Sequence, residues 1–382
     1  MDIFETMDLF HSYKNSKVES LKNINIKVGK GKKTALLGAN GAGKSTLFYH
    51  FNGVFKPKSG TVLFDGKPME YTKDALAELR SDVSVMLQNP DEQIFSATVE
   101  EDIAFGMLNQ GMVREEIDAR IDEVLSMVGM TEYRMRPTQQ LSYGQRKRVA
   151  FAGAIATHPK VLIMDEPTAG LDPQMAQETL EIADQLHIGG TDVIISTHDV
   201  DLAYAWADEI HVLRNGTLVY SGVSEGFYKD SVAVALAGLM PPAMFAIDSN
   251  LTEICGIGNG KYPHTRAELL SKMAVKDTKT GTLYGIPVDD YIDQAMIDCV
   301  LAHAEEGAAV GIYGIQTRRI AYKEALRLDY VFDGMENCLI EVMNGNDAVI
   351  YYDRSLSDMV IGKVVKVSGF GLKIPFEVRG GL

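Results

Sequence analysis

The chain has 382 residues, enough for two domains that each bury a core of their own. Its formal net charge of −15 at pH 7 argues against a protein whose main role is to coat nucleic acid, although a local basic patch such as residues 146–148 is compatible with it. The three cysteines are an odd number and fit no disulfide framework, which indicates a reducing compartment such as the cytoplasm.

The N-terminal residues mix acidic and apolar side chains and lack the basic start and apolar core of a secretory signal. The longest apolar stretch, residues 232–247, is interrupted by Pro241 and Pro242. Neither half approaches the roughly 20 apolar residues that cross a bilayer. We therefore expect any membrane role to depend on a partner that supplies the spanning helices.

Residues 1–222 alternate short apolar strands with helical stretches, which predicts an α/β layered domain. The segment 102–128 has apolar side chains at helical spacing. The segment 210–217 is typical of a hairpin that closes this domain. Buried parallel strands are expected at residues 34–37, 161–164 and 193–196.

A glycine-rich loop follows the first of these strands. Its glycines would let backbone amides approach phosphates closely, and the helix expected from Lys44 would offer its positive dipole end. Lys44 can reach the β- and γ-phosphates, and the Ser45 hydroxyl can bind Mg²⁺. A chance glycine-rich turn is the alternative, but the full Gly-x4-Gly-Lys-Ser spacing favours a nucleoside triphosphate site. The predicted nucleotide-binding residues of this phosphate loop are Gly38, Ala39, Asn40, Gly41, Ala42, Gly43, Lys44, Ser45 and Thr46.

Two carboxylates follow the strand expected at residues 161–164. Asp165 is expected at the carboxyl edge of the sheet, beside Mg²⁺. Glu166 is one residue further along, where it could polarise an attacking water. An acidic pair alone is more often a helix N-cap or a solvated turn. Its position after a phosphate loop favours the catalytic interpretation.

The pentapeptide LSYGQ at residues 141–145 lies between the phosphate loop and the acidic pair. In this position it resembles the signature of ATP-binding cassette (ABC) ATPases, with Tyr143 replacing the first glycine of the commonest form. The resemblance covers residues 8–222, with every motif in the family order. It implies a P-loop NTPase fold with a helical subdomain. It also implies a dimer in which two ATP molecules bind between head-to-tail domains, each closed by the signature of the other subunit.

The same resemblance assigns roles to residues outside the phosphate loop. Tyr13 looks like the aromatic residue that stacks on adenine, and His198 looks like the switch histidine. A lone tyrosine is more often partly packed and a lone histidine more often structural, so both assignments depend on position. The implied nucleotide-binding residues of the partner-facing side are Ser142, Gly144 and Gln145 of the signature, with Asp172 of the crossing loop Ala169–Asp172. The implied catalytic residues are Glu166, His198 and Gln88, and the implied Mg²⁺ ligands are Ser45, Gln88 and Asp165.

The segment 88–106 is more specific than the general motifs. It resembles the ATPases of energy-coupling factor importers, particularly the cobalt and nickel type. In those ATPases this region forms part of a groove that receives a helix from the transmembrane coupling protein. Ile94 and Phe95 beside two acidic residues suit an amphipathic partner helix. The alternative is that at least one of Phe95 and Phe105 is simply a core aromatic.

The importer resemblance implies ATP and Mg²⁺ as cofactors and an ATPase coupled to transmembrane transport. It further implies transmembrane coupling and substrate-binding subunits as partners, and a homodimer or a dimer with a paralogous ATPase, without nucleic acid. The expected location is peripheral, on the cytoplasmic face of the cell membrane. Two other functions stay open. One is a soluble ABC ATPase, although the long coiled-coil insertion or second phosphate loop of such proteins is missing from the sequence. The other is a sensor module that uses the cassette as its switch.

Residues 223–275 are interpreted as a linker and helical extension, with a short helix over 263–273 capped by Thr265. Residues 276–382 predict a second, smaller α/β domain whose role the sequence leaves open. In it, Cys299 and His303 would share one face of a helix over residues 289–304, and two ligands without a third favour core residues over a metal site. The other expected elements are strands at 308–314 and 348–352, a helix at 317–326, and a structural turn at 311–314 in preference to a ligand-binding one.

Overall fold

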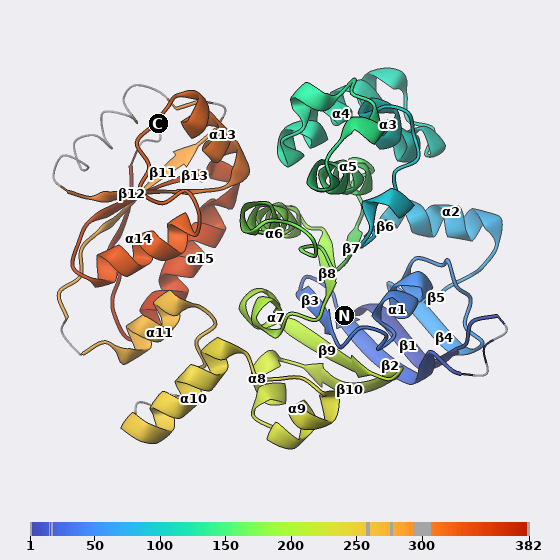
Figure 1. Ribbon diagram of the computed structural model, residues 1–382, viewed down its shortest axis with the longest axis horizontal. Coiled ribbons are helices and arrows are strands. Elements are labelled where there is room, and N and C mark those ends of the chain that lie inside the picture. The colour runs from blue at the N-terminus through green and yellow to red at the C-terminus, as the bar shows by residue number, and fades with distance from the viewer. Residues whose placement is uncertain are drawn as a thin grey trace. The chain divides into compact units, whose positions relative to one another are not determined.

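The computed structural model forms two compact units, Met1–Pro241 and Pro242–Leu382, which are described separately (Figure 1). The helix expected at residues 289–304, with Cys299 and His303, lies almost entirely outside the described residues. The structure describes residues 2–14, 16, 18–256, 260–275, 278–289, 291–292, 296 and 307–379.

A six-stranded sheet forms the centre of the first unit. In spatial order its strands are β10 (Thr217–Gly222), β9 (Glu209–Arg214), β3 (Lys33–Leu37), β8 (Asp192–Thr197), β7 (Val161–Asp165) and β6 (Val83–Met86). The strands from β9 to β6 run parallel, and β10 pairs antiparallel with β9. Every residue of β7 and β8 is buried, because both carry the apolar or β-branched runs of a covered parallel sheet. The three expected strands and the expected hairpin are confirmed.

A second, antiparallel sheet packs over helix α1 (Lys44–Phe51). Its strands, in spatial order, are β2 (Leu21–Gly29), β1 (Asp2–His11), β4 (Ser59–Phe64) and β5 (Lys67–Pro68). Phe4 of β1 stacks on Phe51 of α1, with ring centroids 4.3 Å apart. Apolar side chains of this sheet, of α1 and of the larger sheet share one core cluster, so the phosphate loop is fixed on both sides.

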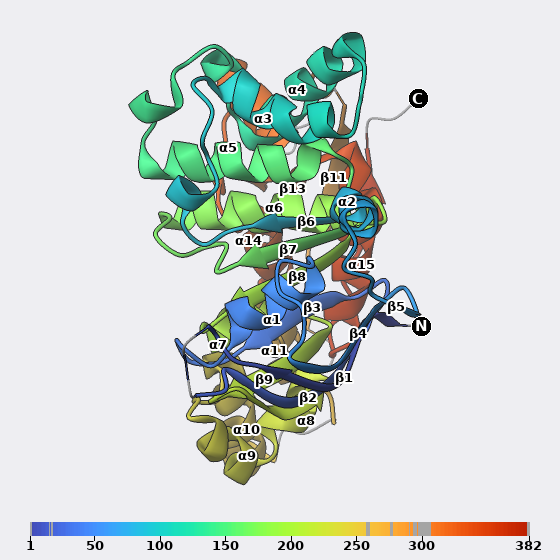
Figure 2. The same ribbon diagram turned by 90° about the vertical axis from the view of Figure 1, so that its right-hand side faces the viewer.

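A group of three helices lies beside the six-stranded sheet, near its strands β6 and β7 (Figures 1 and 2). It consists of α3 (Val99–Asn109), α4 (Arg114–Val128) and α5 (Tyr143–Ala156). The helical pattern expected at 102–128 is therefore two helices, because Gly111 adopts a φ of 76° and turns the chain between them. Arg134 ties the group together through ion pairs with Glu100, Asp118 and Asp122. The remaining helices of the unit are α2 (Lys73–Asp82), η1 (Pro90–Glu92), η2 (Thr131–Tyr133), η3 (Thr138–Gln140), α6 (Pro173–Ile188), α7 (Val200–Trp206), α8 (Ser224–Tyr228) and α9 (Ser231–Ala237).

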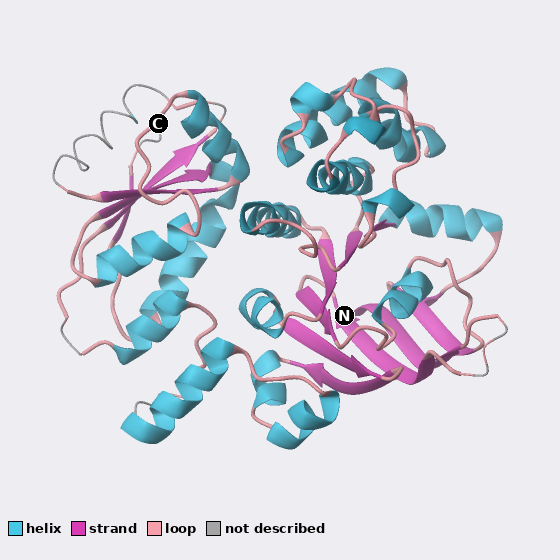
Figure 3. Ribbon diagram, in the orientation of Figure 1, coloured by secondary structure: helices cyan, strands magenta, loops and turns pink. Residues whose placement is uncertain are grey.

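The second unit is a smaller α/β domain built on a parallel four-stranded sheet (Figure 3). Its strands, in spatial order, are β12 (Ala309–Tyr313), β13 (Ala348–Asp353), β11 (Leu283–Val288) and β14 (Phe376–Val378). The cap of its helix α11 is the expected Thr265, whose side chain accepts from the Glu268 amide. Its described helices are α10 (Ala243–Cys255), α11 (Arg266–Met273), α13 (Ile315–Lys323), α14 (Gly334–Met343), η4 (Arg354–Leu356) and α15 (Ser357–Ser368).

The turn after β12 is structural, as expected. Gly314 has a φ of 106° and approaches Asp353 so closely that a Cβ would lie 2.4 Å from the carboxyl carbon. The Asp353 carboxylate accepts from the Thr317 amide at 2.6 Å and caps the first turn of α13. The helix therefore begins two residues before the expected residue 317. The Asp353 carboxylate therefore takes the position at the start of α13 where a ligand-binding turn would hold an anion.

No helix among the described residues is both long enough and apolar enough to cross a membrane. The apolar stretch 232–247 is divided between α9 and α10, on either side of Pro241 and Pro242.

Glu209, at the start of β9, carries a buried carboxylate that joins β2 to the larger sheet. It accepts from the Gly29 amide at 2.7 Å and from the Lys32 ammonium at 2.8 Å, and His211 Nε2 lies 3.6 Å away. Burial alone would raise the pKa of Glu209, but the bonds from His211, Lys32 and Gly29 outweigh it and lower the pKa to about 2.

We expect Glu209→Gln to lower the free energy of unfolding by about 1–3 kcal/mol at pH 7. Because the folded pKa lies below the unfolded value, the stabilisation is fully present above about pH 4.5 and is lost as the pH falls toward 2. Urea unfolding of both proteins at pH 7 and pH 3.5 measures the difference, which should narrow at the lower pH. Glu123→Gln, at an exposed side chain, is the control. A difference that stays constant with pH would contradict this account.

Candidate active site

The ends of neighbouring parallel strands bring the predicted motifs to one edge of the larger sheet. The phosphate loop follows β3, Asp165 ends β7, and His198 follows β8. Because β3, β8 and β7 are adjacent and parallel, their carboxyl ends meet at the same edge. Gln88 follows β6, the next strand along that edge.

Glycine is required at two points of the phosphate loop. Gly38 approaches β9 so closely that a Cβ would lie 2.4 Å from the carbonyl oxygen of Leu213. Gly43 has a φ of 105° and precedes the first residue of α1. The loop therefore delivers the chain directly into a helix N-terminus, where backbone amides favour an anion. Lys44 is buried, and its Nζ donates to the Gly38 carbonyl at 2.6 Å.

Glu166 lies next to Lys44, and Asp165 precedes it at the end of β7. Lys44 Nζ is 3.3 Å from Glu166 Oε1, and both side chains are buried. Ser196 of β8 holds the acidic pair: its hydroxyl donates to Asp165 Oδ1 and accepts from the Glu166 amide at 3.1 Å. The phosphate-loop lysine and both carboxylates thus form a single cluster.

His198 completes this cluster. Its Nδ1 lies 2.9 Å from Glu166 Oε2, so the Glu166 carboxylate is held between an ammonium and an imidazole. The imidazole itself is largely exposed. A carboxylate fixed in this way beside a phosphate loop can orient and deprotonate a water.

Tyr13 lies against the helix that follows the phosphate loop. Its hydroxyl is 2.8 Å from Thr46 Oγ1, and its ring meets His11 and Phe55 edge-on. The side chain is about half exposed, which leaves ring surface for a stacked base.

The signature residues bond within their own part of the chain. Ser142 and Gln145 form a capping box at the start of α5, and Gly144 packs on Met175 of α6. Asp172 caps α6 by accepting from the Met175 amide at 2.8 Å. Among the described residues, no hydrogen bond or ion pair joins these four to the phosphate loop. Within the described part of the chain, these four residues therefore make no bond to their own phosphate loop, whereas Tyr143 of the same signature donates to the Gln88 carbonyl at 3.3 Å.

Two residues of this region were not predicted from the sequence. Ser196 was expected only as part of a strand. Its position near the end of a strand that neighbours the acidic pair could have predicted a hydrogen bond to that pair. Lys147 was considered only within residues 146–148, as a local basic patch that the net charge allows, and all three side chains are instead paired within the chain. Lys147 is buried and donates to the carbonyls of Glu166 and Ala169, Arg146 pairs with Asp91, and Arg148 pairs with Glu178.

Comparison with known proteins identifies the family. The family model described as ABC transporter matches residues 21–169. The chain is 47% identical over 242 residues to the energy-coupling factor transporter ATP-binding protein EcfA of Methanocaldococcus jannaschii, covering 63% of this chain and 86% of that protein. This chain belongs to the ABC transporter ATPase family. As an ABC ATPase it hydrolyses ATP in support of transport, and its relatives are ATP-binding subunits of energy-coupling factor transporters.

Solved structures agree with this assignment. The ABC ATPase resembles cbiO1 of Clostridium perfringens, described as part of the complex cbiONQ, with a TM-score of 0.56 and 37% identity over 66% of this chain and 99% of that chain. It also resembles an ATP-binding cassette solved as a dimer bound to ADP and Pi, with a TM-score of 0.54 and 26% identity over 58% of this chain and 98% of that chain. The predicted P-loop NTPase fold with a helical subdomain is confirmed.

The second unit of this ABC ATPase also has a relative. EcfA2 of Methanospirillum hungatei is 34% identical over 370 residues, which is 95% of this chain and 92% of that protein. Because the match covers nearly the whole chain, it extends through the second, smaller α/β domain.

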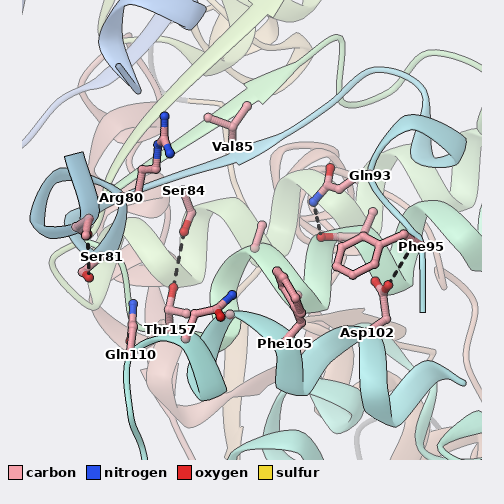
Figure 4. A pocket seen from close by; sticks show the side chains of 16 residues that line it. Arg80, Ser81, Ser84, Val85, Gln93, Phe95, Asp102, Phe105, Gln110 and Thr157 are labelled. Carbon is pink, nitrogen blue, oxygen red and sulfur yellow. Dashed lines mark hydrogen bonds between the residues drawn. The ribbon is translucent and has the colours of Figure 1, made fainter. Parts of the chain in front are cut away.

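A groove of about 380 Å³ lies beside the Gln88 segment of the ABC ATPase, between α2, β6, α3 and α5 (Figure 4). Phe95 is 65% exposed and Phe105 is 46% exposed, with ring centroids 4.6 Å apart. The expectation that at least one of them is a core aromatic is therefore wrong, because both lie at the groove. Asp102 holds the Phe95 loop in place by accepting from the amides of Phe95 and Ser96.

Proposed function

We propose that this ABC ATPase works as a dimer on the cytoplasmic face of the cell membrane and drives an energy-coupling factor importer of cobalt or nickel ions. The observation that carries the proposal is the meeting of Lys44, Glu166 and His198 at one edge of the larger sheet, in a unit that also has a groove with two exposed phenylalanines. The first part suits ATP hydrolysis, and the second suits a partner helix.

ATP would bind with its phosphates on the loop Gly38–Thr46 and its adenine on Tyr13. The open ring surface of Tyr13 and its bond to Thr46 support the second contact. Lys44 would exchange its contacts with Gly38 and Glu166 for the β- and γ-phosphates.

Mg²⁺ would be held by Ser45, Gln88 and Asp165. Hydroxyl, amide and carboxylate oxygens are the ligands that this hard cation prefers, and all three residues follow adjacent strands or the phosphate loop at the same edge. When bound, the ion would neutralise charge on the phosphate oxygens.

Glu166 would take a proton from the attacking water, and His198 would orient the Glu166 carboxylate and contact the γ-phosphate. Gln88, two residues after β6, would report nucleotide occupancy to the groove lined by residues on either side of it in the sequence. Ser142, Gly144, Gln145 and Asp172 would act on the nucleotide of the other subunit, which accounts for their separation from their own phosphate loop.

The groove would receive a helix of a transmembrane coupling subunit. Its exposed Phe95 and Phe105 offer apolar contact area, and Arg80 and Asp102 offer charges beside it (Figure 4). The ion assignment is supported by the likeness of residues 88–106 to the cobalt and nickel type. Selection of the ion would belong to a membrane subunit.

Purification of the tagged full chain from native membranes tests the proposal. We expect membrane subunits to co-purify, and proteoliposomes of the complex to take up cobalt or nickel ions with ATP. Phe95→Asp should abolish co-purification, because it places a charge in the apolar groove, while ATP turnover of the free subunit is unchanged.

Met135→Asp is the matched control, since Met135 is equally exposed but lies outside the groove. Recovery of only water-soluble partners would overturn the importer assignment. Uptake of a vitamin in place of either ion would contradict the proposed ion substrate and leave the importer assignment intact.

A further inference from the structure

Lys147 links the signature helix to the catalytic cluster. It lies on α5, its side chain is 1% exposed, and its Nζ donates to the carbonyls of Glu166 at 3.0 Å and Ala169 at 2.7 Å. These carbonyls belong to the residue beside the strand end of β7 and to the start of the crossing loop. One ammonium therefore fixes two catalytic segments to the helix that begins at Ser142.

The backbone that Lys147 holds is strained. Glu166 has a φ of 47°, a left-handed conformation that costs a residue other than glycine about 1–2 kcal/mol. Its amide donates to Ser196 and its carbonyl accepts from Lys147, so both peptide groups of Glu166 are held. The conformation directs the carboxylate between Lys44 and His198. Without Lys147, the Glu166 carbonyl would keep only the bond from the Ala169 amide at 3.2 Å and would lose its link to α5.

Tyr143 makes a second set of contacts on the same side of α5, one turn before Lys147. Its hydroxyl donates to the Gln88 carbonyl at 3.3 Å. Its ring covers Gly170 of the crossing loop, where a Cβ would lie 2.9 Å from Tyr143 Cε1. A glycine at 143, as in the commonest signature, could make neither contact. The two side chains together join Gln88, Glu166 and the crossing loop to one helix.

Burying the Lys147 ammonium costs desolvation free energy. Burial lowers the pKa of Lys147 to about 8, although the nearby charges of Glu166 and Asp165 oppose the shift. An apolar side chain of similar length would fill the same volume without desolvating a charge. Packing alone therefore does not account for a lysine, whereas the two carbonyl contacts do.

We propose that Tyr143 and Lys147 are positioning residues that transmit closure of the signature on one nucleotide to Glu166 and Gln88 of the same chain. The inference rests on the proposed head-to-tail dimer, in which Ser142 engages the nucleotide of the partner. When α5 moves toward that nucleotide, Lys147 sets the backbone of Glu166 and Tyr143 sets the segment of Gln88. Each subunit would thereby align its own catalytic carboxylate in response to the other's ATP.

The test compares Lys147→Met with Arg120→Met in the full chain. Arg120 is a matched control: it is buried and donates to two backbone carbonyls, those of Ile155 and Ala156, away from the cluster. We expect Lys147→Met to lower kcat by about 10²-fold, because displacement of a catalytic group by about 1 Å has effects of this size. The KM for ATP and the ATP-stabilised dimer should be retained. Arg120→Met should lower the melting temperature at least as much and leave kcat within about threefold.

Tyr143→Phe provides a second variant that keeps the ring on Gly170 and removes only the bond to Gln88. It should retain the KM for ATP and lose kcat by about 3- to 10-fold, as expected for one hydrogen bond. Equal kcat losses in Lys147→Met and Arg120→Met, or a kcat loss accompanied by loss of the ATP-stabilised dimer, would overturn the proposal. Because these assays use the ATPase without membrane subunits, failure of the importer assignment would appear only in the co-purification and uptake experiments.

Discussion

Glu166→Gln is expected to lower ATP turnover by about 10²- to 10⁴-fold while the protein accumulates as an ATP-stabilised dimer. Glutamine preserves the size of the side chain and can still bond His198, so the cluster should keep its shape. It cannot accept a proton from water. Binding and closure would therefore proceed, and the step that reopens the dimer would not. Phosphate release measures turnover, and size-exclusion chromatography with and without ATP measures the dimer.

Glu178→Gln is the control for the loss of a buried carboxylate. Glu178 lies on α6, pairs with Arg148 at 2.5 Å and belongs to no part of the cluster. Its replacement should reduce stability and leave both turnover and dimer formation close to those of the unchanged protein. Wild-type turnover in Glu166→Gln would remove Glu166 as the catalytic base and reassign the proton transfer to another group.

Equal mixtures of Lys44→Met and Ser142→Arg proteins should recover activity that neither protein has alone. Lys44→Met removes a charged contact with the phosphates, worth about 1.5–3 kcal/mol, which raises the Kd for ATP by about 10- to 150-fold. Ser142→Arg places a bulky cation where the signature must close on the partner's nucleotide. In a mixed dimer, one nucleotide site combines the altered phosphate loop with the altered signature. The other site combines the two unchanged motifs. With random assembly, recovery of roughly a quarter of the unchanged turnover is expected.

A mixture of Lys44→Met with the double variant Lys44→Met/Ser142→Arg is the matched control. Every site in that mixture lacks the phosphate-loop lysine, so no recovery is expected. Recovery should also depend on protein concentration, since exchange of subunits is required. Absence of recovery from mixed dimers that have been shown to form would contradict a nucleotide site shared between subunits.

The central part of the fold was predictable because short, contiguous sequence segments specify its strands and the motifs that follow them. The strands β3, β7 and β8 are short buried runs, and a glycine loop, an acidic pair and His198 stand at their respective carboxyl ends. Parallel strands bring such ends together, so the meeting of Lys44, Glu166 and His198 follows from sequence order and sheet topology. The hairpin of β9 and β10 carries its own turn residues.

The antiparallel sheet and the helix contacts were not predictable in the same way. The pairing of β1 with β2 and β4 is interrupted by register shifts, so the alternation of buried and exposed residues is broken. Lys147 contacts carbonyls 19 and 22 residues further along the chain, and no local pattern encodes such a bond. The exposure of Phe95 and Phe105 depends on how α3 and α5 pack around the groove, and composition alone favours a core aromatic.

The contact between Lys44 and Glu166 bears on the affinity of the site for nucleotide. Each of the two buried charges has the other as a partner. In the proposed site a triphosphate that binds Lys44 would separate them, so the free energy of this contact would oppose binding and be regained once the phosphates leave. The same contact therefore favours product release. In the proposed cycle this ion pair would lower the affinity for ATP and for the hydrolysis products alike, and the free energy of ATP hydrolysis would set the direction.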